Sequence, residues 1–245
     1  MVERRVGVSG WTYPPWRGDF YPKGLPQREE LAYAASRLTS IEINGSFYAL
    51  QKPESYRRWR DQTPDGFVFA VKGSRFITHM KRLGDAKEPL ERFFGSGVWE
   101  LGDRLGPILW QLPASFEYDE ERLATFFDLL PRTSPEGARV RHALEFRSPT
   151  FETRRAYDLL RRHDIACVLA DTAGRWPKVD EDTSDFRYVR LHGDTELYAS
   201  GYDDRALDRW AATIKRWPKD TYVYFDNDAK GHAPHDAERL IARLR

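Results

Sequence analysis

Residues 142–171 read HALEFRSPTFETRRAYDLLRRHDIACVLAD, and this segment decides the fold class. It begins with a short apolar run that ends in Glu145 and Arg147. An amphipathic stretch follows over residues 152–163, and a second apolar run spans residues 165–171. Two strand-like runs joined by a helix-like stretch are typical of a βαβ unit in a parallel sheet. The segment therefore predicts an α/β fold.

The same alternation extends over the whole sequence. It predicts eight strands, at residues 5–11, 40–47, 67–73, 107–112, 142–147, 165–171, 188–192 and 222–226. Helix-like segments lie between them, at residues 28–38, 53–61, 89–105, 120–130, 152–163 and 203–217, and residues 237–245 close the chain. Residues 171–185 show no helical pattern, so we expect the sixth crossover to be degenerate. Eight strands in 245 residues predict one (β/α)8 TIM-like barrel, because a doubly wound sheet more often has five or six strands. No linker divides residues 1–245, which predicts a single domain.

Composition excludes several classes of protein. Hydrophobic residues make up 40% of the chain, which is enough for one large core, and the net charge is only +1. The single cysteine, Cys167, excludes an internal disulfide and a cysteine-based zinc site. The longest apolar run in the predicted strands, residues 165–170, is far shorter than the roughly 20 residues of a membrane span. We therefore expect a soluble, cytoplasmic protein with no membrane partner. Since GxxxxGK and GxGxxG motifs are absent, we expect no nucleotide cofactor.

Polar side chains gather where the predicted strands end. Side chains alternate across a strand, so Glu42 shares a face with Asn44, and Arg190 shares one with His192. Residues between them, such as Ile43, would face the surrounding helices, as would Phe146 and Leu191. We expect the polar set to line the catalytic mouth of the barrel. Its members are Glu42, Asn44, Lys72, Gln111, Glu145, Arg147, Asp171, Arg190, His192 and Asp226. The alternative is a purely structural network of mutually satisfied charges.

The residue types in this set suggest a class of ligand. Lys72, Arg147 and Arg190 can hold a phosphate or carboxylate, and arginine offers bidentate geometry. Carboxylates and histidines can instead transfer protons or bind a hard divalent metal such as Mn, Mg or Zn. The candidate metal ligands are Glu42, Glu145, Asp171, His79 and His192. No compact metal-binding motif is present, so a metal depends on convergence from distant strands.

Aromatic residues cluster near the N-terminus. Trp11, Tyr13, Trp16, Phe20 and Tyr21 fall within eleven residues. They could pack over the barrel mouth as structure. Independently of them, His79, beyond the third predicted strand, could be an ordinary loop histidine. The alternative is that Trp11 and Tyr13 form a stacking surface for a sugar ring or a base.

Several short motifs together resemble the YecE-like family, also called domain of unknown function 72. The resemblance covers about residues 6–240, and it combines pieces that are weak one by one. They are Gly7-Val8-Ser9-Gly10-Trp11, Phe20-Tyr21-Pro22, Glu42-Ile43-Asn44, Ile77-Thr78-His79, Gln111-Leu112-Pro113, Glu145-Phe146-Arg147, Arg190-Leu191-His192-Gly193 and Phe225-Asp226-Asn227-Asp228. The resemblance implies a TIM barrel distantly similar to sugar isomerases and barrel endonucleases, without an established reaction. Asp226 and Asp236 stand where the family more often has Asn.

Three functions are compatible with these observations. The leading hypothesis is an enzyme acting on a small sugar, polyol or sugar phosphate by isomerase-like acid/base chemistry. Its catalytic candidates are Glu42, Glu145, His192 and Asp171, with Glu42 or Glu145 as base and His192 as acid. Its substrate-binding candidates are Asn44, Lys72, Gln111, Arg147, Arg190, Asp226, Asn227, Trp11 and Tyr13. The alternatives are metal-assisted binding or hydrolysis of nucleic acid, and a barrel that binds a ligand without turning it over.

Overall fold

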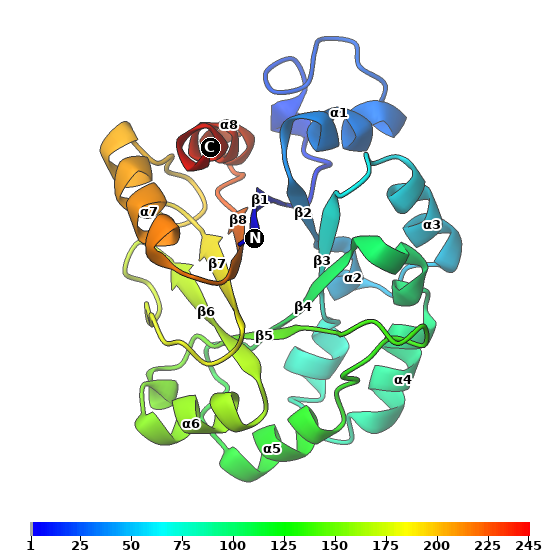
Figure 1. Ribbon diagram of the computed structural model, residues 1–245, viewed down its shortest axis with the longest axis vertical. Helices are drawn as coiled ribbons and strands as arrows, with labels where there is room; N and C mark the ends of the chain where they lie inside the picture. The colour runs from blue at the N-terminus through cyan, green and yellow to red at the C-terminus, as the bar shows by residue number, and fades with distance from the viewer. Residues whose placement is uncertain (1) are drawn as a thin grey trace.

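The strands of the computed structural model, which describes residues 2–245, form one closed parallel barrel (Figure 1). Their order around the barrel is β1 to β8, and each strand pairs with the next along the chain. The strands are β1 (Arg4–Ser9), β2 (Ser40–Ile43), β3 (Val68–Lys72), β4 (Leu105–Gln111), β5 (His142–Glu145), β6 (Ile165–Asp171), β7 (Phe186–Leu191) and β8 (Asp220–Phe225). This confirms the predicted TIM-like barrel.

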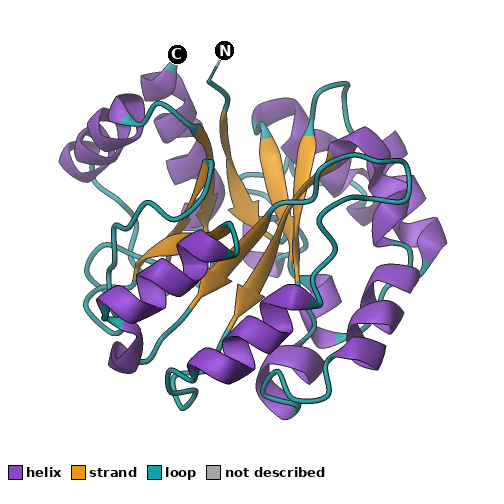
Figure 2. Ribbon diagram, turned by 60° about the horizontal axis from the view of Figure 1, so that its bottom comes forward, coloured by secondary structure: helices purple, strands orange, loops and turns teal. Residues whose placement is uncertain are grey.

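Helices surround the barrel, and the strands between them point their arrowheads toward one end (Figure 2). The α-helices are α1 (Glu30–Arg37), α2 (Gly45–Tyr48), α3 (Pro53–Asp61), α4 (Lys87–Gly95), α5 (Glu120–Asp128), α6 (Arg154–Arg162), α7 (Asp204–Arg216) and α8 (His232–Leu244). Shorter helical turns are η1 (Pro14–Trp16), η2 (Gln27–Glu29), η3 (Phe76–Met80), η4 (Val98–Arg104) and η5 (Pro149–Phe151). No α-helix separates β6 from β7 among the residues that the structure describes, as the sequence predicted.

Side-chain alternation divides the apolar residues into two layers. Ile43, Phe146 and Leu191 pack in the outer layer between strands and helices, as expected from the sequence. The inner layer fills the barrel with small residues and with the rings of Phe186, Tyr188, Tyr222 and Tyr224. A filled interior is typical of TIM barrels. Glu42, Glu145 and Arg190 lie beyond it, toward the end where the strands finish.

The predicted second strand is too long. β2 ends at Ile43, and the backbone enters a helical conformation at Asn44 to begin α2. The Ser46 hydroxyl donates to the carbonyl oxygens of Ile43 and Lys72, at 3.0 and 2.7 Å, and so fastens α2 to the ends of two strands. The other strand boundaries differ from prediction by no more than two residues.

Two helix predictions were also wrong in their extent. The predicted helix at residues 89–105 is broken at Gly97, whose φ of +117° ends α4 before η4 begins. A side chain at Gly97 would also place its Cβ 2.5 Å from the Cα of Pro53. The closing helix, α8, starts at His232 rather than at residue 237, because Gly231 turns the chain with a φ of +77°.

Candidate active site at the barrel mouth

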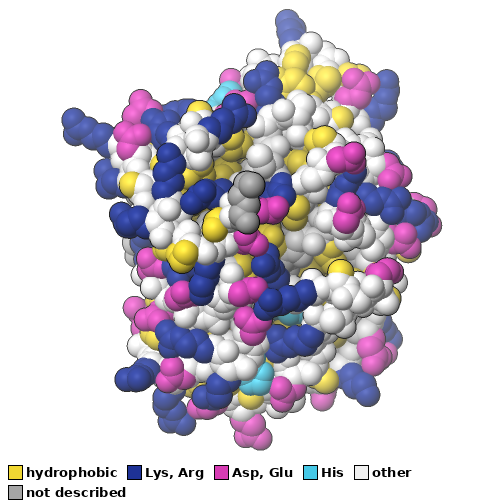
Figure 3. Space-filling model, viewed as in Figure 1, with side chains coloured by type: hydrophobic (Ala, Val, Ile, Leu, Met, Phe, Trp, Pro, Cys, Tyr) yellow, Lys and Arg dark blue, Asp and Glu magenta, His cyan; other side chains and the backbone are white. Residues whose placement is uncertain are grey.

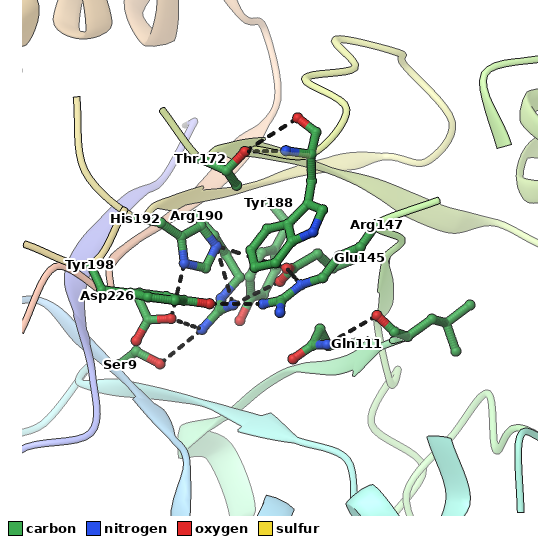
Figure 4. A network of polar contacts seen from close by, with 12 residues as sticks. Ser9, Gln111, Glu145, Arg147, Thr172, Tyr188, Arg190, His192, Tyr198 and Asp226 are labelled. Atoms are coloured by element: carbon green, nitrogen blue, oxygen red, sulfur yellow. Dashed lines mark hydrogen bonds and ion pairs between the residues drawn. The ribbon is translucent and has the colours of Figure 1, made fainter. Parts of the chain in front are cut away.

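A buried ionic network centred on Arg190 forms the floor of the site (Figure 4). Arg190 lies in β7, and its guanidinium reaches carboxylates from three other strand ends. It donates to Glu42 at 3.1 and 2.8 Å, to Glu145 at 2.7 Å and to Asp226 at 2.9 Å. Ser9 donates to the same Glu42, and the Tyr188 hydroxyl donates to it at 2.6 Å. All three carboxylates around Arg190 therefore accept hydrogen bonds from its guanidinium.

The charges of this network fix its protonation. Burial alone would raise the pKa of Glu145, but Arg190 and Arg147 outweigh it and hold that pKa well below its ordinary range. Burial likewise opposes ionisation of Asp226, yet Arg190 and His192 lower its pKa to about 2. His192 completes the floor, with Nδ1 3.1 Å from Asp226 and Nε2 3.8 Å from Glu145. Both carboxylates are thus ionised at neutral pH.

Above this floor lies an open pocket of about 390 Å³. That volume suits a small metabolite, since ligand pockets typically measure about 300–1,000 Å³. Its walls combine aromatic rings with groups that can donate, accept or carry charge. The lining residues are Tyr13, Asn44, Phe47, Tyr48, Lys72, His79, Gln111, Arg147, Tyr198, Asp226, Asp228 and Ala229. Six predicted site residues meet here, namely Tyr13, Asn44, Lys72, Gln111, Arg147 and Asp226, together with the candidate metal ligand His79.

Two cations reach this pocket from different strands. Lys72 ends β3 and is only 6% exposed, with Nζ 4.4 Å from the centre of the Phe47 ring. Arg147 follows β5 and lies flat against Trp176, with its guanidinium carbon 3.8 Å from the ring centre. Arg147 also donates to Glu145 at 3.1 Å and to the Tyr198 hydroxyl at 3.2 Å. These contacts hold Arg147 in place at the pocket wall.

Three groups in the pocket, one of them the cation Lys72, have displaced pKa values. Burial and the neighbouring Asp226 charge raise the pKa of Asp228 well above its ordinary value. Burial, Lys72 and Arg147 lower the pKa of His79 to about 4, so its imidazole is neutral at pH 7. Burial and the Arg190 charge lower the pKa of Lys72 to about 8. Such displaced pKa values in one pocket are typical of acid/base sites.

The structure places three predicted site residues elsewhere. Asp171 was expected in the polar ring, but Ala170 faces the barrel interior, so Asp171 points outward and lies 3.2 Å from Lys178. Asn227 also points away from the pocket, and its amide donates to Ser200 and Asp236. Trp11 packs edge-on against Trp59, with ring centres 5.3 Å apart. The position of Asp171 follows from the alternation of side chains along β6, and those of Asn227 and Trp11 follow from the packing of their loops.

The expected metal ligands do not form a metal site. Arg190 stands between Glu42 and Glu145, where a cation bound by both would have to lie. Asp171 lies outside the barrel, and His79 lies in the pocket wall above. Within residues 2–245, no group of three or more His, Cys, Asp or Glu side chains is arranged to hold a metal ion.

Sequence reasoning missed several contributors to the site. Ser9 and Tyr188 hold Glu42, Trp176 supports Arg147, and Asp228 lines the pocket. Strand alternation could have found Tyr188, since it lies two residues before Arg190 on the same face. Asp228 stands within the quoted Phe225-Asp226-Asn227-Asp228 motif. Trp176 lies in the irregular loop after β6 and gave no local signal.

Comparison with known sequences identifies the family. The family described as "Protein of unknown function DUF72" matches residues 5–245. The chain belongs to this family. The UPF0759 protein YecE of Escherichia coli K12 is 34% identical over 138 residues, which are 56% of this chain and 48% of YecE. The UPF0759 protein YunF of Bacillus subtilis is 23% identical over 98% of this chain and 94% of YunF. The DUF72 chain thus aligns with about half the length of YecE.

Solved structures support the same fold. A DUF72 family protein from Thermotoga maritima has a TM-score of 0.84 and 27% identity, with 99% of each chain covered. A DUF72 protein from Enterococcus faecalis has a TM-score of 0.79 and 16% identity, over 98% of this chain and 95% of that one. SacUVDE shares the fold at a TM-score of 0.60 but only 8% identity, over 100% of this chain and 98% of its own. No helix in residues 2–245 is long and apolar enough to cross a membrane.

Proposed function

We propose that this DUF72 protein is an enzyme that binds a small anionic, sugar-like molecule at the barrel mouth and moves protons on it. The convergence of Lys72 and Arg147 on one small pocket that also holds His79 and Asp228 carries the proposal. The two cations select an anionic group, while neutral His79 serves as base and Asp228, whose pKa is raised, serves as acid. Tyr13 and Phe47 add ring faces on which a sugar can pack.

The floor and the walls of the pocket then have different tasks. Glu42, Glu145, Arg190 and His192 were expected to act on the substrate directly, but each is at most 1% exposed and does not line the pocket. We assign them to holding Arg147 and Asp226 in position. The groups that touch substrate are then Lys72, Arg147, His79 and Asp228. A rigid supporting layer of this kind is what precise positioning of reacting groups requires.

Incubation with dihydroxyacetone phosphate in D₂O tests this function. The compound carries a phosphate, a hydroxyl and a carbonyl, and proton abstraction beside the carbonyl replaces carbon-bound hydrogen with deuterium. We expect NMR to show deuterium exchange faster than in buffer alone. We also expect calorimetry to show that Arg147→Met binds the compound at least tenfold more weakly than the wild-type protein does. Arg155→Met, on the exposed face of α6, is the control. Lack of binding by wild-type protein, or binding that Arg147→Met leaves unchanged, would overturn the proposal.

No observation favours nucleic acid as the substrate. The arginines of α6 are paired with acids, since Arg155 and Arg162 both reach Glu120, at 3.1 and 2.9 Å. Arg161 pairs with Asp158 and Glu181. Figure 3, which views the side where the strands begin, shows basic and acidic side chains interspersed on that face rather than gathered into a basic stripe. A phosphate backbone needs such a continuous positive surface.

A further inference from the structure

Lys72 is a buried lysine without an ionic partner. Within residues 2–245, no carboxylate oxygen lies within 4.0 Å of its Nζ, although Lys72 is 6% exposed. By contrast, the more exposed Lys219 lies 2.6 Å from Asp182, and Lys178 lies 3.2 Å from Asp171. A buried ammonium without a carboxylate partner loses much of its solvation. The position therefore lowers the pKa of Lys72 to about 8, so that far more of it is the neutral amine at neutral pH than of an exposed lysine.

Arg190 explains why Lys72 is left without a partner. The nearest acids of the floor, Glu42, Glu145 and Asp226, all direct oxygens to the guanidinium of Arg190. Arg190 thus takes the counter-charges that a lysine at this position would use. It also adds a positive charge nearby, which with burial brings the pKa of Lys72 to about 8. A neutral amine in a pocket is a nucleophile.

We propose that Lys72 forms an imine with the carbonyl group of an aldehyde or ketone that also carries a phosphate or carboxylate. This inference rests on the proposed function and names the reactive group of its substrate. Arg147, held against Trp176, would bind the anionic group while the carbonyl carbon reaches Nζ of Lys72. The size of the pocket, about 390 Å³, limits the substrate to a small molecule.

The reaction balances with groups that line this pocket. The lone pair of Nζ forms a bond to the carbonyl carbon, and the carbonyl oxygen gains a proton. The nitrogen then loses a proton, the C–OH bond breaks as that oxygen takes a second proton, and water leaves. Asp228, whose pKa is raised, supplies the first proton to the carbonyl oxygen. Neutral His79 accepts the proton that the nitrogen loses and passes it to the C–OH oxygen as the second. Water later returns to hydrolyse the imine. In between, the cationic imine acidifies the adjacent C–H bond, which would serve the proton transfer proposed above.

Reductive trapping tests this proposal on the whole protein. Wild-type protein is incubated at pH 7.5 with dihydroxyacetone phosphate, and separately with pyruvate, in the presence of sodium cyanoborohydride. Cyanoborohydride reduces an imine to a stable secondary amine, which peptide mass spectrometry assigns to one lysine. We expect Lys72 to be modified at least tenfold faster than any exposed lysine, because far more of it is the free amine at this pH. Lys72→Met should lose the adduct, and Lys23→Met, at an exposed position, should keep it.

The outcomes separate the two proposals. An adduct at Lys72 that inorganic phosphate suppresses supports imine formation in the pocket. Deuterium exchange without any Lys72 adduct overturns the imine and leaves the proposed acid/base function intact. Labelling of Lys72 no faster than that of Lys23 also overturns the imine, since the amine would then have no special reactivity. Failure of both compounds to bind would overturn both proposals.

Discussion

Arg190 and Glu42 form a two-point ion pair at the centre of the barrel, with Nε 3.1 Å from Oε2 and Nη2 2.8 Å from Oε1. Neither side chain has any exposed surface. The pair joins β7 to β2 across the barrel, and Glu145 and Asp226 extend it to β5 and the end of β8. One arginine therefore ties the ends of four strands together beneath the pocket.

Removing this arginine should destabilise the fold strongly. Arg190→Met leaves the buried Glu42 without its cation and takes one ion pair each from Glu145 and Asp226, and loss of one partner of a buried pair typically costs about 3–5 kcal/mol. We expect the free energy of unfolding, measured in urea, to fall by at least about 3 kcal/mol. Arg155→Met, which removes a surface pair, should change it by less than about 1 kcal/mol. Equal losses in the two variants would contradict a central role for Arg190.

His142 should make the protein less stable as the pH falls below neutrality. Burial lowers its pKa to about 4, and Trp110 donates to its Nδ1 at 3.2 Å while Nε2 lies 2.8 Å from the Pro131 carbonyl. The unfolded state therefore binds a proton near pH 6.5, whereas the folded state resists it until about pH 4. The destabilising effect of His142 is therefore absent above pH 6.5. As the pH falls from 6.5 to 4, it lowers the free energy of unfolding by about 3 kcal/mol.

Urea unfolding at pH 7 and at pH 5 measures this effect. The difference in stability between the two pH values should be smaller for His142→Gln than for wild-type protein, because glutamine does not titrate. Comparing the two proteins cancels the contributions of the other histidines. Parallel pH profiles would show that His142 is free to accept a proton in the fold.

Trp176 should strengthen ligand binding without touching the ligand. Its ring holds the guanidinium of Arg147, and exposed cation–π contacts contribute about 0.5–1 kcal/mol. We expect Trp176→Ala to raise the Kd for dihydroxyacetone phosphate by about two- to fivefold in calorimetry. Trp217→Ala removes a similar contact, with Arg187, outside the pocket and should leave the Kd unchanged. Equal effects of the two substitutions would argue against positioning by Trp176.

The contribution of Asp236 to stability should depend on both of its carboxylate oxygens. Its Oδ2 accepts from the Tyr202 backbone N–H and from the Asn227 amide, both at 3.0 Å, and its Oδ1 accepts from Arg239 at 3.0 Å. Asparagine has only one side-chain oxygen and would turn an N–H group toward a donor. Asp236→Asn should lower the free energy of unfolding by about 1–2 kcal/mol. Asp208→Asn, at an exposed pair, is the control, and equal stability of both variants would exclude this role.

Local sequence patterns predicted most of the fold. Alternating strand and helix patterns located all eight strands and the missing helix after β6, because each element buries a periodic apolar face. Prediction was wrong where one backbone position changed direction. Asn44 begins α2 inside a predicted strand, and Gly97 divides a predicted helix. Such breaks depend on contacts with distant residues, as between Gly97 and Pro53.

Strand parity also brought most of the candidate site together. Glu42, Lys72, Glu145, Arg190 and Asp226 all occupy inward positions at the ends of their strands, as predicted. Asp171 did not, because its neighbour Ala170 takes the inward position on β6. A polar residue at a strand end therefore does not by itself predict a side chain that faces the barrel interior. The register of the whole strand is needed to tell which residues face inward.

The sequence by itself determined the barrel and the end at which the polar side chains of the candidate site collect, because these follow from the periods of strands and helices. Only the tertiary structure decided which polar groups face a ligand. Arg190 and Lys72 look alike in sequence as strand-end cations, yet one is enclosed by carboxylates and the other is left facing the pocket without a partner. That difference depends on distances between side chains from separate strands, and no local pattern encodes them.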